Sequence, residues 1–161
     1  MVHCGGVGRQ YYTFGFGFVI IQQGINDIIH PVGVEKNQFR PMSDLPTVDE
    51  LLGGIKRYIS FARERDFKVY LGTLLPVDGW RTYEDWRDYL KAGFNLGLKR
   101  MSDESKDSNK PIGFIDFDKA LQDELDSRKF KTEYDSGDHL HPSKKGYKRM
   151  AEEAFRWIKE D

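Results

Sequence analysis

The chain has 161 residues, and its 25 Lys and Arg residues nearly balance its 26 Asp and Glu residues, leaving a formal net charge of -1. This length suits a single domain, and the even charge gives no electrostatic reason to expect a nucleic-acid partner. The only cysteine, Cys4, cannot form an intrachain disulfide. No apolar run approaches the roughly 20 residues of a membrane-spanning helix, so stable membrane insertion is not expected. No signal-peptide pattern opens the sequence, which predicts a cytoplasmic location for the chain as it stands.

The pattern of apolar residues in the first part of the chain changes at residue 18. Residues 1–17 are rich in glycine and aromatic residues without helical or strand periodicity, so we assign them no regular structure. Residues 18–21 form a short β-branched run that predicts a strand buried on both faces. Thr47 and Glu50 have the spacing of a capping box, which predicts a helix from there to about residue 65. Residues 68–75 then predict a second apolar strand.

Further elements follow in the second half of the chain. Residues 82–101 predict a helix, and the charged residues 99–110 predict a solvated loop. Residues 111–117 predict a third strand, followed by a short amphipathic stretch over residues 118–125. Ser143 predicts the N-cap of a last helix, and five residues of that helix are expected to face inward: Tyr147, Met150, Ala151, Ala154 and Ile158.

Apolar strands that alternate with helices indicate the α/β class, with a parallel sheet covered by helices on both faces. In such sheets the chemistry lies at the carboxyl ends of the strands. The sequence therefore directs the search for functional residues to the segments that follow each strand.

The first of these segments is Gly24-Ile-Asn26-Asp27. A glycine at a strand end permits a tight turn, after which the Asn26 amide can donate a hydrogen bond to a developing oxyanion. The same residues also fit a simple turn in which the Asn and Asp side chains bond to their own backbone.

The second segment is Asp135-Ser-Gly-Asp138-His-Leu-His141-Pro, directly before the last helix. An aspartate three residues ahead of a histidine can reach the imidazole Nδ1–H, so Asp138 and His141 form a candidate acid–base pair. A plain helix-capping loop is the alternative. His139 and His141 with Asp135 and Asp138 also suggest a metal site, but no other ligand cluster accompanies them and we expect no metal.

A strand ending in G-x-N-D, with D-x-x-H-P before the C-terminal helix, resembles the SGNH (GDSL-like) hydrolase superfamily. Residues 71–76, 115–118 and 134–142 add similarity to its lysophospholipase-L1-like branch of serine esterases. The resemblance implies a three-layer, flavodoxin-like α/β fold and hydrolysis of small acyl esters, either acyl lipids or acylated sugars. It also implies a Ser-His-Asp mechanism without metal or organic cofactor. Full-length members of this superfamily are often secreted.

The resemblance also implies roles for particular residues of this chain. Asn26 corresponds to the oxyanion-hole asparagine, Asp138 to the acid that orients the histidine, and His141 to the general base. Gly24 and Asp27, on either side of Asn26, are expected to border the substrate.

The superfamily places its nucleophilic serine in a Gly-Asp-Ser turn after a strand that precedes the G-x-N-D strand. The residues before Gly24 include no serine, and Cys4 lacks the strand or helix context that would activate a thiol. We therefore expect residues 18–161 to be the C-terminal two-thirds of a hydrolase domain, lacking its first strands and inactive alone. The strand at 18–21 would then be an exposed edge through which the chain self-associates. The alternative function is a non-catalytic remnant or binding module that retains the pocket.

Overall fold

The structure is a computed structural model that describes residues 17–29, 46–77 and 85–160. The irregular segment predicted for residues 1–17, including Cys4, lies almost wholly outside these ranges. The elements, in chain order, are β1 (Phe18–Ile21), α1 (Ile25–Ile29), α2 (Val48–Arg63), β2 (Lys68–Gly72), α3 (Asp85–Glu104), β3 (Ile112–Ile115), α4 (Phe117–Leu121), the 3-10 helix η2 (Thr132–Tyr134) and α5 (Lys144–Glu160).

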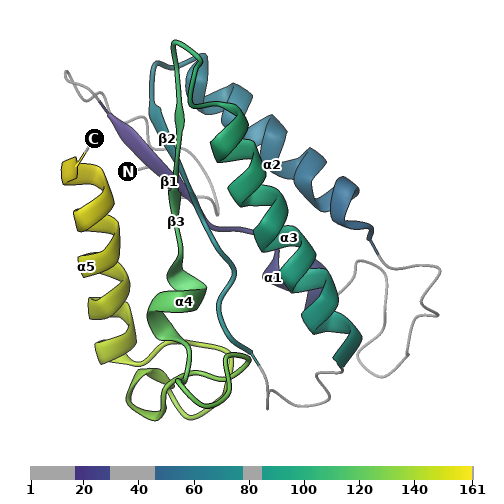
Figure 1. The fold of residues 1–161 in the computed structure, drawn as a ribbon, viewed down its shortest axis with the longest axis vertical. Helices are drawn as coiled ribbons and strands as arrows, with labels where there is room; N and C mark the ends of the chain where they lie inside the picture. The colour runs from purple at the N-terminus through teal and green to yellow at the C-terminus, as the bar shows by residue number, and fades with distance from the viewer. Residues whose placement is uncertain (1–16, 30–45, 78–84, 161) are drawn as a thin grey trace, which may run out of the picture.

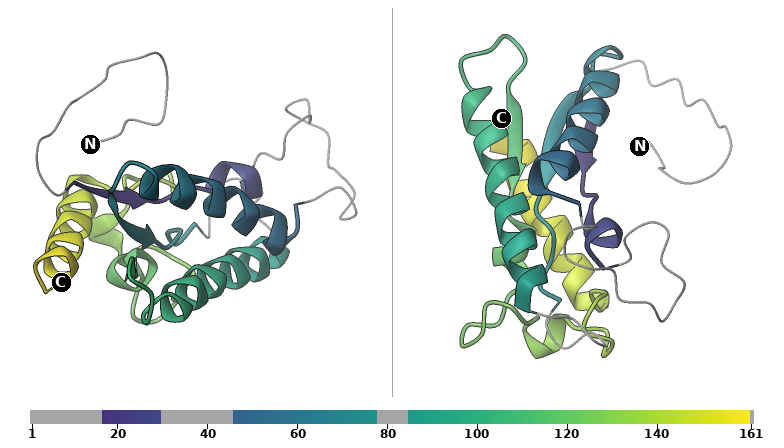
Figure 2. Two further views of the ribbon diagram at one scale, coloured as in Figure 1. Left: turned by 90° about the horizontal axis from the view of Figure 1, so that it is seen from above. Right: turned by 90° about the vertical axis from the view of Figure 1, so that its right-hand side faces the viewer.

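The described strands form one parallel sheet in the order β1-β2-β3. Helices α2 and α3 cover one face of this sheet, and α4 and α5 cover the other (Figures 1 and 2). The three-layer α/β architecture expected from the alternating pattern is therefore confirmed. Among the described residues, no helix is both long and apolar enough to cross a membrane.

The middle strand, β2, is apolar throughout because both of its faces are covered. Val69 and Leu71 pack into the core beneath α2 and α3, whereas Tyr70, between them, packs on the opposite face with α4 and α5. On the neighbouring strand, a Cβ at Gly113 would lie 2.2 Å from Cδ1 of the buried Tyr70 ring. Close packing of the ring against β3 therefore requires glycine at that position.

The two helix starts predicted from capping patterns are confirmed. The Thr47 hydroxyl accepts a hydrogen bond from the Glu50 backbone N–H at 3.2 Å, and the Glu50 carboxylate accepts from the Thr47 N–H at 2.8 Å. At α5, the Ser143 hydroxyl accepts from the Gly146 N–H at 3.2 Å. These side chains satisfy backbone donors that have no partner within the helix.

Several of the boundaries predicted for helices and strands were wrong. Strand β2 ends at Gly72 rather than at residue 75, and β3 ends at Ile115 because Asp116 caps α4, accepting from the Lys119 N–H at 3.0 Å. Residues 102–104, predicted as loop, belong to α3, and residues 99–101, where the helix and loop predictions overlapped, are helical as well. The buried Ser102 hydroxyl there donates to the Ile112 carbonyl at 2.6 Å, which fixes the end of the helix against β3.

The predicted inward face of α5 is only partly correct. Ala154 is buried, and Met150 and Ile158 are half-buried against the sheet. Tyr147 is 56% exposed, and Ala151, one turn later on the same side of the helix, is exposed as well. Ala151 faces the space beside β1, where the described sheet has ended and offers no strand to cover it.

Strand β1 likewise differs from the expectation of a strand buried on both faces. It pairs with β2 alone among the described strands, and Phe18 at its start is 47% exposed. The strand is therefore an edge of the described sheet, which agrees with the exposed edge expected from the resemblance.

Candidate active site

The turn after β1 places Asn26 in the first turn of α1. Gly24 has φ = +121°, a conformation that L-residues rarely adopt, and a Cβ there would lie 3.2 Å from the ring of buried Phe94. The Ile28 N–H donates to the Gly24 carbonyl at 3.2 Å, which starts α1 directly after the turn. Asn26 and Asp27 are both exposed. Gly24 thus allows the chain to reverse, and the Asn26 amide is presented to solvent.

Side chains that sequence reasoning missed tie the carboxyl ends of the strands together. The Gln22 amide after β1 donates to the Thr73 carbonyl after β2 at 2.9 Å. Asn95 of α3 accepts from the Leu74 N–H at 2.8 Å and donates to the Leu74 carbonyl at 3.1 Å. These bonds hold the segments after β1 and β2 in a fixed relation.

A buried ion pair supports the same region from α3. The Lys91 ammonium lies 3.2 Å from the Asp118 carboxylate, and the Lys91 side chain is only 6% exposed. Burial raises the pKa of Asp118, while the charge of Lys91 opposes that rise. The pair joins α3 to α4 beneath the carboxyl end of β3.

Asp138 and His141 form the hydrogen-bonded pair that their spacing predicts. Nδ1 of His141 lies 2.6 Å from Oδ2 of Asp138. The other carboxylate oxygen accepts from the backbone N–H groups of Leu140 and His141, at 2.9 and 2.8 Å, and from the Ser136 hydroxyl at 2.9 Å. These hydrogen bonds hold the pKa of Asp138 well below its usual range. The bond to the His141 ring has the largest effect, and the backbone N–H bonds add to it.

This geometry determines which imidazole nitrogen is available for chemistry. A carboxylate can only accept, so the proton of the neutral His141 ring lies on Nδ1 and Nε2 carries a lone pair. The His141 side chain is 62% exposed. His141 is therefore oriented with Nε2 able to take a proton from a neighbouring hydroxyl group.

The ionisation of Asp138 can be measured directly. Because its pKa is lowered in the folded chain, we expect the Asp138 carboxylate to remain ionised at pH 3.8, the ordinary pKa of this group. The stabilisation from its hydrogen bonds is present above the ordinary pKa and is lost only as the pH falls through the lower folded value. Carboxyl ¹³C chemical shifts recorded across an acid titration check this, and a midpoint at or above 3.8 for Asp138 would contradict it.

The same loop holds a second Asp–His pair that spacing alone did not reveal. Nδ1 of His139 lies 2.7 Å from Oδ2 of Asp135. In the sequence these two residues suggested only a minor metal hypothesis. No group of three or more metal-ligating side chains is assembled within the described ranges.

The structure brings Asp138 and His141 into contact, whereas Asn26 lies on a different element. Helix α1 and the loop that precedes α5 both lie beyond the carboxyl ends of the strands (Figure 1). None of the four main cavities formed by the described residues contains both Asn26 and His141. That Asn26 acts together with His141 consequently remains a prediction.

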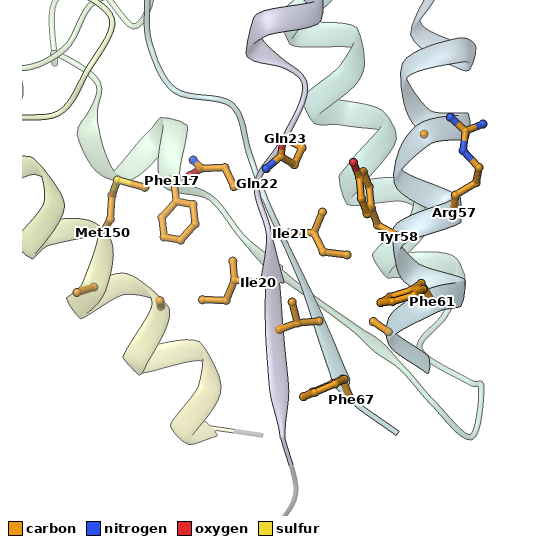
Figure 3. Close-up of a pocket in the computed structure, with 15 residues that line it drawn as sticks. Ile20, Ile21, Gln22, Gln23, Arg57, Tyr58, Phe61, Phe67, Phe117 and Met150 are labelled. Carbon is orange, nitrogen blue, oxygen red and sulfur yellow. The ribbon is translucent and has the colours of Figure 1, made fainter. Parts of the chain in front are cut away.

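The largest of these four cavities, about 850 Å³, is an apolar groove beside β1 that we call the β1 groove. Ile20 and Ile21 form its floor, Tyr58 and Phe61 of α2 line one side, and Met150 lies on the other side (Figure 3). None of the predicted site residues lines it. The β1 groove runs along the free edge of β1, between α2 and α5. Its shape therefore suits another strand better than a small substrate.

Comparison with known proteins assigns the fold and the family. The family model for GDSL-like lipase/acylhydrolase matches residues 9–154, so the chain belongs to this family of ester hydrolases. A search of curated proteins found no match. The predicted resemblance to GDSL-like hydrolases is therefore confirmed.

Solved structures show the same fold. One is a protein from Bacteroides fragilis assigned as an acylhydrolase, with a TM-score of 0.64 and 22% identity. Another is a GDSL-like lipase from Bacteroides thetaiotaomicron, with a TM-score of 0.64 and 20% identity. In each comparison the match covers 89% of this chain and 62% of the other. The chain thus spans less than two-thirds of the length of these relatives.

Proposed function

We propose that this chain carries the general base, the orienting acid and one oxyanion donor of an ester hydrolase, namely His141, Asp138 and Asn26. Residues 18–161 would form the C-terminal part of the hydrolase domain. The observation that carries the proposal is the 2.6 Å contact between Nδ1 of His141 and Oδ2 of Asp138, in a chain of the GDSL-like lipase/acylhydrolase family. The exposure of the His141 side chain supports it further, since the ring is accessible to a reacting group.

The proposed reaction is acyl transfer through a serine. Nε2 of His141 takes the proton of a serine hydroxyl, and the serine oxygen attacks the ester carbonyl carbon. Asp138 stabilises the imidazolium, and the Asn26 amide donates to the carbonyl oxygen as it becomes negative. His141 then protonates the leaving alcohol. Water, activated by the same histidine, hydrolyses the acyl-enzyme and restores the serine.

The serine of this mechanism has no candidate among the described residues near His141. The Ser136 hydroxyl donates to Asp138, and the Ser143 hydroxyl donates to the Glu133 carbonyl at 2.7 Å while capping α5. No serine precedes Gly24 in the sequence. By the arrangement of the family, we propose that the mechanism needs a nucleophilic serine in a Gly-Asp-Ser turn after a strand beside β1, and no serine of this kind stands before Gly24 in this sequence.

The substrate class follows from the family and from the proposed mechanism. We propose a small acyl ester, either an acyl lipid or an acylated sugar, that lies over α1 with Gly24 and Asp27 at its border. The steps above use no metal or organic cofactor.

Because no serine of the described residues stands free beside His141, one alternative remains: a non-catalytic module that keeps the pocket without the nucleophile. A fluorophosphonate probe separates the two functions. We expect no labelling of the chain alone, and stoichiometric labelling once a segment with a strand and a Gly-Asp-Ser turn precedes it. Failure of the extended chain to react would favour the non-catalytic module. Labelling of the chain alone at a mapped serine would refute the inference that its own residues supply no nucleophile.

We also propose that the isolated chain self-associates through β1 and the β1 groove. The strand has a free edge in the described sheet, and apolar side chains flank it on both sides. Tyr58 and Phe61 are 46% and 51% exposed on one wall of the groove. With a net charge of -1, copies of the chain repel each other little, so a second copy can cover this surface.

A further inference from the structure

The loop from residue 135 to residue 141 contains an interaction that the proposed mechanism does not use. The Asp135 side chain is only 12% exposed and accepts three hydrogen bonds. They come from the backbone N–H of Gly137 at 2.8 Å, the backbone N–H of His139 at 3.1 Å and the His139 ring at 2.7 Å. Asp135 therefore holds both the backbone and the side chain of residue 139.

Residue 139 needs such support because its backbone is strained. His139 has φ = +61°, in the left-handed region that residues other than glycine seldom occupy. Strain of this kind persists only where the surrounding structure compensates for it. The ring and backbone bonds from His139 to Asp135 are the compensating interactions that the structure provides.

The conformation of residue 139 controls the geometry of the neighbouring pair. His139 lies directly between Asp138 and Leu140, and the N–H groups of Leu140 and His141 turn back to the Asp138 carboxylate at 2.9 and 2.8 Å. An extended backbone at residue 139 would direct the following residues away from Asp138. Both N–H bonds and the contact between Asp138 and the His141 ring depend on this turn.

The ends of the loop are fixed independently. The Ser136 N–H donates to the His141 carbonyl at 3.0 Å, and the Ser143 N–H donates to the Tyr134 carbonyl at 2.7 Å. A change at position 139 therefore acts inside a closed loop and leaves the start of α5 in place.

We propose that Asp135 and His139 are positioning residues, which hold the left-handed turn that sets Asp138 against His141. This inference rests on the proposed function, because it gives the pair a purpose only if His141 is the general base. The two histidine–aspartate pairs then have different tasks: Asp138 orients the catalytic ring, and Asp135 with His139 keeps the backbone that makes this orientation possible.

Two substitutions at one position separate this role from simple packing. His139→Ala removes the ring bond but keeps a Cβ that opposes the left-handed turn. His139→Gly removes the same ring bond together with the backbone strain. The readout is the Nδ1-bound proton of His141 in ¹⁵N-labelled chain, observed by ring ¹H–¹⁵N correlation spectra together with its exchange with water.

We expect exchange of the His141 Nδ1 proton to become about tenfold faster or more in His139→Ala. The reason is that this variant keeps the backbone strain but loses the ring bond that compensates for it. His139→Gly should stay close to the wild type, and Asp135→Asn should resemble His139→Ala. Unchanged exchange in His139→Ala would overturn the proposal. Equal acceleration in the Ala and Gly variants would also overturn it, since relief of strain would then have no effect.

The substitution Asp138→Asn, which changes the partner of the His141 ring itself, distinguishes a failure of this inference from a failure of the proposed function. Loss of the His141 Nδ1 proton signal in Asp138→Asn, with no effect of His139→Ala, would refute the positioning role and leave the catalytic pair intact. If the wild-type chain shows no proton on Nδ1 of His141, both proposals fall.

Discussion

Replacing His141 by alanine is expected to abolish ester hydrolysis and fluorophosphonate labelling in the extended protein, in which a strand and a Gly-Asp-Ser turn precede this chain. Without the imidazole, no group accepts the serine proton, and kcat should fall by about 10⁴-fold or more. Asp138→Asn should cause a large loss as well, because an amide at position 138 can favour the wrong tautomer of the ring. Initial rates with a 4-nitrophenyl ester, measured beside labelling, give both values.

Lys145→Ala is the matched control for this experiment. Lys145 lies in the first turn of α5, close in sequence to His141, and its ammonium forms an exposed 3.4 Å ion pair with Glu133. Surface pairs of this kind contribute little, so activity should be unchanged. Retained labelling in the His141→Ala protein, with a normal Lys145→Ala protein, would exclude His141 as the general base.

The second large effect concerns the surface beside β1. We expect the wild-type chain to sediment as a self-associated species, and Phe61→Lys to weaken this association by about tenfold or more, since burial of a Phe side chain contributes about 1.5–3 kcal/mol. Phe61 is half-exposed on the wall of the β1 groove, so the lysine should not disturb the core. Sedimentation velocity over a range of concentrations measures the change.

Tyr89→Lys provides the comparison, because Tyr89 is an aromatic residue of α3 that is 81% exposed and does not line the β1 groove. It should associate like the wild type. A monomeric wild-type chain, or a Phe61→Lys chain that associates as strongly as the wild type, would show that β1 and its groove are not the contact surface.

Residue spacing predicts an interaction correctly where both partners lie close together in the sequence. The capping box of Thr47 with Glu50 and the cap at Ser143 involve residues within one helical turn, so their spacing predicts them. The contact of Asp138 with His141 spans three residues and could be predicted in the same way. The apolar character of residues 69–71 likewise indicated a strand covered on both faces, as β2 is.

Other features depend on information that no short segment contains. Helical periodicity defines a face of α5 but not where the sheet beneath it ends, and for this reason Ala151 was predicted to face inward. The pairing of Asp135 with His139 depends on a positive φ at a histidine, which residue type does not indicate. Gln22 and Asn95 act through contacts with segments distant in sequence, which only the folded chain brings together.

The proposed site requires that the side chain at position 26 and the ring of His141 face the same space beyond the strands. A spin label attached to Asn26→Cys, in a chain whose only native cysteine is replaced by Cys4→Ser, tests this most directly. We expect the label to broaden the His141 ring signals strongly, and chemical reduction of the label to restore them. If the His141 signals stay sharp in the labelled chain, Asn26 and His141 do not share a site and the proposed function is refuted.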